Sequence, residues 1–183
     1  MDKKSIIKNL VQRHQEFGEY LGSLSRKDFE ISRKEKWNAG QDLDHIVKSI
    51  KPLSNVLSNK EFIATKFGKG NGISSDYEIL VSRYKDKIAE GGVAFGEFIP
   101  EKISWDKKEG LLRQLHELIE KITEALQQYT EEELDELLLP HPLLGSLTVR
   151  EMLYFTNYHV THHRNNISRN LRSIENQVDS REL

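Results

Sequence analysis

The sequence contains no cysteine among its 183 residues. This absence excludes disulfide bonds, thiolate metal sites and a cysteine nucleophile. Any thiol chemistry would therefore need a thiol that arrives with a substrate. A strong charge of one sign is also lacking, since the formal net charge is −2. Such a chain has no electrostatic footprint for a polyanion, so we expect no nucleic-acid partner.

Long hydrophobic runs are missing as well. The basic start, "MDKKSIIKNLVQRHQ", is not followed by an apolar segment of the kind found in signal peptides. No run approaches the roughly 20 apolar residues that a membrane span requires. We therefore expect no membrane partner and a cytoplasmic protein. Strand signals are scarce too, and only residues 91–99 ("GGVAFGEFI") resemble one.

Helical signals dominate the rest of the chain. Apolar residues recur at helical spacing in four long segments, which cover residues 2–24, 38–57, 106–126 and 148–177. Short polar residues followed three positions later by Glu or Gln predict capped starts for three of these segments, in the pairs Asn38 with Gln41, Asp106 with Glu109, and Thr148 with Glu151. Pro52 predicts a kink or an early end within the second segment.

Shorter helices are expected between the long ones. Ser75 with Glu78 predicts the start of one that ends at the Gly91-Gly92 pair, and Thr130 with Glu133 predicts a single capped turn. The sequence thus predicts an all-α protein, a four-helix bundle that forms one domain over residues 1–183. An additional short helix and loops are expected between the second and third long helices.

Histidine is concentrated in the last long segment, where "YHVTHHRNN" holds three of the seven in the chain. His159 and His163 are four residues apart and share one helical face, whereas His162 lies to one side. That face is otherwise mostly apolar, and a buried polar group without a partner costs on the order of 1–3 kcal/mol. A metal ion or a water-filled cavity would satisfy both imidazoles. Ordinary hydrogen bonds at a partly exposed edge would do so too, and for an isolated pair they are the commoner outcome.

A metal site needs more than this pair, because catalytic zinc takes three protein ligands and keeps one position open. The remaining candidates are His14, His45, His116 and nearby carboxylates. His14 lies on the apolar stripe of the first segment, as a core or supporting residue, and His116 flanks the stripe of the third. By the same angular count, His45 lies away from the apolar stripe of the second segment. Spacing alone does not select the third ligand.

Two stretches of the sequence resemble a known family. The stretches "WNAGQDLDHI" (37–46) and "HPLLGSLTVREMLYFTNYHVTHHRNNI" (141–167) are similar to the DinB-like superfamily of helix-bundle proteins, which includes the YfiT-type thiol transferases. In that family a tryptophan opens the second helix and a histidine follows eight residues later. A His-Pro-x-x-Gly-x-Leu-Thr element precedes a fourth helix that carries His-x-x-x-His. Residues 59–104 depart from the family pattern and leave the substrate pocket undefined.

The resemblance implies both a site and a reaction. It implies a divalent ion, zinc or nickel, held by His45, His159 and His163, with a water or thiolate on the metal as the nucleophile. It also implies a small-molecule substrate, with transfer of a low-molecular-weight thiol to an electrophile, or hydrolysis, and a homodimer. The alternative is a non-enzymatic metal-binding or dimeric interaction module whose metal site is structural or vestigial.

Overall fold

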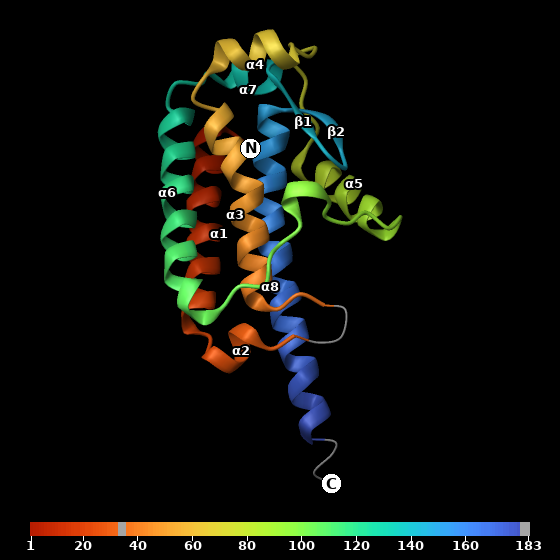
Figure 1. The fold of residues 1–183 in the computed structure, drawn as a ribbon. Coiled ribbons are helices and arrows are strands. Elements are labelled where there is room, and N and C mark those ends of the chain that lie inside the picture. Colours follow the sequence, from red (N-terminus) through yellow and green to blue (C-terminus); the bar gives the residue numbers. More distant parts are fainter. Residues whose placement is uncertain (33–35, 180–183) are drawn as a thin grey trace.

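Four long helices form the body of the protein, as the computed structural model shows for residues 1–32 and 36–179 (Figure 1). They are α1 (Lys3–Ser23), α3 (Ala39–Val56), α6 (Lys108–Leu126) and α8 (Val149–Asp179). Helices α1 and α3 each pack against both α6 and α8, so every long helix has two long neighbours. The predicted all-α bundle is confirmed.

Shorter helices close the ends and one side of the bundle (Figure 1). They are α2 (Arg26–Glu30), α4 (Lys60–Phe67), α5 (Tyr77–Ala89), α7 (Glu131–Glu136) and the 3-10 turns η1 (Gly96–Phe98) and η2 (Trp105–Lys107). Two helices, α4 and α5, therefore lie between the second and third long helices, where the sequence predicted one. The eight residues of α4 span about two turns, which is too few for a clear apolar period.

A small hairpin precedes α8, formed by strands β1 (Leu138–His141) and β2 (Gly145–Thr148). The strands are antiparallel, with Leu138 opposite Thr148 and His141 opposite Gly145. Gly145 has a φ of 76°, which suits a residue without a Cβ at the turn. The sequence analysis missed this hairpin, because four-residue strands show little alternation. It placed its only strand signal at 91–99, where the structure has irregular backbone and η1 instead.

Three of the predicted helix starts are confirmed in atomic detail, those at Asn38, Thr130 and Thr148. The Asn38 side chain accepts from the backbone N–H of Gln41, whose own side chain accepts from Asn38 N. The same reciprocal pair joins Thr148 and Glu151 at the start of α8, at 3.1 and 2.9 Å. Helix α3 continues past Pro52 to its end at Val56, so the proline does not end it.

Two other predicted starts are wrong. The N-cap of α5 is Asp76 rather than Ser75, because the backbone N–H of Ser75 is bound by Glu151 of α8. Asp106 lies inside η2, and α6 begins only at Lys108, without a side-chain cap. At Ser75 a contact with a distant helix takes precedence over the local pattern. The capped turn predicted at Thr130 is present as α7.

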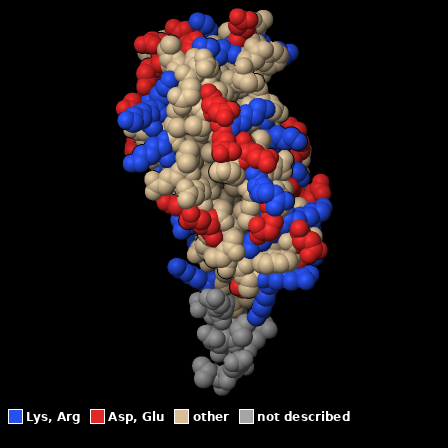
Figure 2. All heavy atoms as spheres, turned by 90° about the vertical axis from the view of Figure 1, so that its left-hand side faces the viewer, with Lys and Arg blue, Asp and Glu red and all other residues tan. Residues whose placement is uncertain are grey.

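The surface carries both signs of charge. Figure 2 views the side on which α6 lies, and lysine and arginine side chains alternate there with aspartate and glutamate. This face of the described chain has no extended patch of one sign. Among the described residues, none of the helices combines the length and the apolar character needed to cross a membrane.

Candidate metal centre

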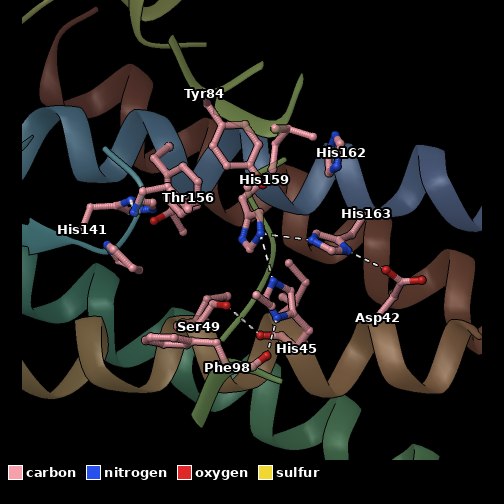
Figure 3. A pocket seen from close by; sticks show the side chains of 18 of the residues that line it. Asp42, His45, Ser49, Tyr84, Phe98, His141, Thr156, His159, His162 and His163 are labelled. Atoms are coloured by element: carbon pink, nitrogen blue, oxygen red, sulfur yellow. Dashed lines mark hydrogen bonds and ion pairs between the residues drawn. The ribbon is translucent and has the colours of Figure 1, made fainter. Parts of the chain in front are cut away.

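Three histidines from two helices meet inside the bundle (Figure 3). Nε2 of His159 lies 3.2 Å from Nε2 of His45 and 3.1 Å from Nε2 of His163. All three residues are buried, and their candidate ligand atoms all lie within 4.8 Å of one another. The structure thus brings together the three residues that the sequence analysis named, in an arrangement that could hold a metal ion.

His45 reaches this group because α3 packs between α6 and α8. The margin of α3, which a helical count places away from the apolar stripe, therefore faces α8 rather than solvent. Nδ1 of His45 lies 2.7 Å from the carbonyl oxygen of Phe98 in η1. Since a carbonyl oxygen only accepts, Nδ1 carries the proton and Nε2 of the neutral ring presents a lone pair.

A carboxylate orients the His163 ring. Nδ1 of His163 lies 2.5 Å from Oδ1 of Asp42, which is buried one turn before His45 on α3. Burial raises the pKa of Asp42 to about 7 and lowers the pKa of His163 to about 3. A carboxylate that accepts from Nδ1 leaves a lone pair on Nε2 of His163, as in many histidine metal ligands. The sequence analysis did not identify Asp42, because nothing in its spacing links it to a residue 121 positions later.

The three imidazoles are neutral at pH 7. Burial, followed by the neighbouring imidazoles, lowers the pKa of His159 far below its ordinary value. Burial also lowers the pKa of His45 to about 4. Neutral imidazole is the form that binds metals, so the protonation state required of a ligand is already present.

The three Nε2 atoms have too few hydrogens to satisfy one another. His45 places its hydrogen on Nδ1, and so does His163 when Asp42 is ionised, so that each then points a lone pair at His159. Nε2 of His159 can donate one hydrogen at most. At least one of its two short contacts therefore points an Nε2 lone pair at a nitrogen that has no hydrogen left to donate to it, which is unfavourable. A cation can accept a lone pair from each of the three Nε2 atoms. Hydrogen bonds among the three rings alone cannot satisfy all three atoms.

Aromatic rings surround the imidazoles. The Trp37 ring centroid lies 5.0 Å from that of His45 and 6.0 Å from that of His163. Phe155 stacks on His159 at 4.7 Å, and Tyr84 of α5 approaches the same imidazole edge-on at 6.1 Å. These contacts restrict the rotation of the three rings and so keep their nitrogen atoms directed at one point.

The remaining candidates lie elsewhere. His116 is exposed beside Glu120, and half-buried His162 contacts the side-chain amide of Asn166 at 3.0 Å. His14 is buried, with Nδ1 2.7 Å from the carbonyl oxygen of Leu10, and no hydrogen-bond partner for its Nε2 lies among the described residues. None of the three belongs to the group formed by His45, His159 and His163.

A cavity of about 1050 Å³ opens beside the three histidines. Helices α3 and α8 form two of its walls. A third comes from residues 84–99, within the segment that the family resemblance left undefined. The cavity is mainly apolar near the hairpin, where its lining includes Leu53, Phe67, Leu139, Leu143 and Met152, and more polar near Asn166, Arg169 and Asn170. Its size suits a small organic molecule.

Comparison with known proteins identifies a family that this sequence matches. The profile of the DinB superfamily matches residues 9–167, a range that contains all three histidines of the group and both stretches noted in the sequence. No curated protein and no solved structure shows a significant match to the chain.

Proposed function

Because the chain belongs to the DinB superfamily, we propose that it binds one divalent metal ion, zinc or nickel, through Nε2 of His45, His159 and His163. The observation that carries this proposal is the shortage of hydrogens among three buried Nε2 atoms, of which that of His159 lies 3.2 Å from that of His45 and 3.1 Å from that of His163. These three histidines therefore fit a divalent ion. Asp42 and the carbonyl of Phe98 hold two of the rings in the tautomer that a metal requires.

We further propose that the site is catalytic. When bound, the ion supplies a Lewis acid that retains its full charge, because neutral imidazoles add none, and it activates a thiol or water at neutral pH. Among the described residues, no fourth His, Asp or Glu joins the three histidines. Three protein ligands are typical of catalytic zinc, whereas structural sites use four.

The reaction that fits best is transfer of a small-molecule thiol to an electrophile, with hydrolysis as the second possibility. The cavity beside the histidines accommodates a small substrate, and the absence of cysteine means that the thiol must come from outside the chain. Trp37, Tyr84 and Phe155 shield the histidines on several sides, which limits access to ligands that enter through the cavity.

Metal analysis tests the first step. Protein purified without a polyhistidine tag should contain about one zinc or nickel ion per chain, and the His159→Ala, His163→Ala double variant should contain none. His162→Ala is the matched control, since its ring contacts Asn166 and lies outside the group. Unchanged metal content in the double variant would contradict the proposal.

Turnover tests the second step. Zinc-loaded and nickel-loaded protein should convert members of a panel of low-molecular-weight thiols and electrophiles, with products followed by mass spectrometry. The double variant supplies the background rate. The contrary outcome is one bound metal ion per chain with no turnover above that background for thiols, esters or amides. That result would favour the alternative of a non-enzymatic metal-binding module.

A further inference from the structure

The hydrogen position on His141 is determined by two backbone amides. Nδ1 of this residue lies 3.1 Å from the backbone nitrogens of both Leu143 and Leu144, in the turn between β1 and β2. A backbone N–H can only donate, so Nδ1 is the acceptor and the neutral ring carries its hydrogen on Nε2. Burial lowers the pKa of His141 to about 4, which keeps the ring neutral at pH 7. Nε2–H is therefore a donor with a defined direction.

This donor is not used by the protein itself. His141 is 8% exposed and lines the cavity, yet no acceptor for its Nε2 lies within hydrogen-bond distance in the described parts of the chain. Figure 3 shows its ring on the side of His159 opposite to His163. A donor that faces a cavity without a protein acceptor is a natural contact for a ligand.

His141 is close to the three histidines. The centroid of the Phe155 ring lies 4.2 Å from that of His141 and 4.7 Å from that of His159, so both imidazoles contact the same phenyl group. A small molecule in the cavity can therefore touch Nε2–H of His141 while another of its atoms lies at the three-histidine group.

The surroundings of this donor indicate which acceptor it suits. The cavity near the hairpin is lined by apolar side chains, among them Leu139, Leu143 and Met152. The hydroxyl of Thr156 is taken up by a 2.8 Å hydrogen bond to the carbonyl oxygen of Met152. A carboxylate would be buried here beside a neutral ring, at a high desolvation cost. An uncharged oxygen acceptor on a hydrocarbon skeleton complements both the donor and the wall.

We propose that His141 is a substrate-binding residue whose Nε2–H donates to an uncharged oxygen, such as the carbonyl of a ketone, ester or amide. The adjoining apolar wall would hold the hydrocarbon part of the same molecule. The inference rests on the proposed function only in taking this molecule to be the substrate of the three-histidine site. The hydrogen bond itself requires no metal.

Two substitutions separate the roles of the two ring nitrogens. In His141→Asn the side-chain oxygen lies near the former Nδ1 position and accepts the same backbone N–H groups, as in an Asx turn, but nothing reaches the Nε2 position. In His141→Gln the amide NH₂ reaches the Nε2 position, while the acceptor of the turn is lost. His141→Asn should keep the melting temperature of the parent protein, and His141→Gln should lower it.

Acetophenone and ethylbenzene are suitable probes, because they differ by a carbonyl in place of a methylene. Their dissociation constants would be measured by NMR titration of the full chain, both metal-free and zinc-loaded. The ratio of the acetophenone constant to the ethylbenzene constant should rise about tenfold in His141→Asn, the size expected for loss of one hydrogen bond. His141→Gln should keep the ratio of the parent protein.

An unchanged ratio in a folded His141→Asn variant would overturn the proposal, as would failure of the parent protein to bind acetophenone at millimolar concentration. If His141→Asn does not fold, His141→Gln provides the test. A tenfold rise in the ratio of dissociation constants in His141→Gln would contradict the proposal, because this variant keeps a donor at the Nε2 position. Metal content should equal that of the parent in both variants. Failure of metal binding would therefore be seen separately from failure of this contact.

Discussion

Asp42 and His163 form a short contact across the interface of α3 and α8, with 2.5 Å between Oδ1 and Nδ1. The two residues are 121 positions apart in the sequence, and both are buried. The other carboxylate oxygen of Asp42 has no partner among the described residues, so its contact with the imidazole is its main compensation for burial. The pair links the orientation of one candidate ligand directly to the packing of two helices.

Asp42→Asn should weaken zinc binding by about 10- to 100-fold, since the uncharged amide no longer raises the basicity of the His163 ring. Competition with a chromogenic chelator measures the affinity. Asp44→Asn is the matched control, because Asp44 is buried on the same helix but pairs with Lys48 at 2.9 Å and the backbone of Glu101. Equal losses in the two variants would mean that Asp42 has no specific role.

His45→Ala should reduce metal affinity by a large factor, because two imidazoles from one helix leave the ion mostly aquated. It should also remove the stabilisation that zinc gives the parent protein, about 2.7 kcal/mol at a hundredfold excess over the dissociation constant. Thermal unfolding with and without zinc measures both effects, and a large excess of zinc should restore part of the loss.

A His45→Ala variant that binds zinc as tightly as the parent would place the third ligand elsewhere. His14 would then be the first candidate, since it lines the same cavity and its Nε2 has no partner among the described residues.

Acid should destabilise the metal-free protein through His14. Burial lowers the pKa of this ring from 6.5 to about 4, so the unfolded chain binds its proton first as the pH falls. The free energy of unfolding should therefore decrease between about pH 6.5 and pH 4, by on the order of 3 kcal/mol from this residue. His14→Leu should lower the slope of unfolding free energy against pH by the equivalent of up to one proton. Urea unfolding across this pH range measures the slope. An unchanged slope would show that His14 is not buried in its neutral form.

Arg150 connects α8 to α7 and to the start of the chain. Its guanidinium holds Asp135 with two bonds of 2.6 and 3.0 Å, Glu131 at 2.7 Å, and the carbonyl oxygen of Met1 at 2.8 Å. Arg150→Lys should cost about 2 kcal/mol of unfolding free energy, because lysine cannot reproduce the planar fork and leaves a partly buried carboxylate without its partner.

Urea unfolding at pH 7 measures the loss in Arg150→Lys. Arg164→Lys provides the comparison, since Arg164 is half-exposed and lies 3.6 Å from Glu16. That change should stay within about 0.5 kcal/mol. Equal and small effects of both substitutions would contradict the structural role assigned to Arg150.

The homodimer implied by the family resemblance remains a prediction. Apolar helix faces occur in monomeric bundles as well, so periodicity offers no separate support for it. Sedimentation at tens of micromolar should show a species of twice the chain mass, and a single monomeric species would contradict the dimer.

Much of this protein is determined locally, within a few turns of chain. The apolar period of the four long helices, the caps at Asn38 and Thr148, and the shared face of His159 and His163 all follow from backbone geometry over fewer than ten residues. For this reason the bundle and one half of the site are predictable from sequence. The short hairpin and the start of α5 are not, because contacts with distant elements decide them.

Only the tertiary structure decides how the site is completed. His45 joins the other two histidines because α3 packs between α6 and α8, which no count along α3 reveals. The partners that orient the rings, Asp42 and the carbonyl of Phe98, are 121 and 53 positions from the histidines that they contact. Helical periodicity reflects interactions between neighbours in sequence, whereas the meeting of three Nε2 atoms depends on how whole helices pack.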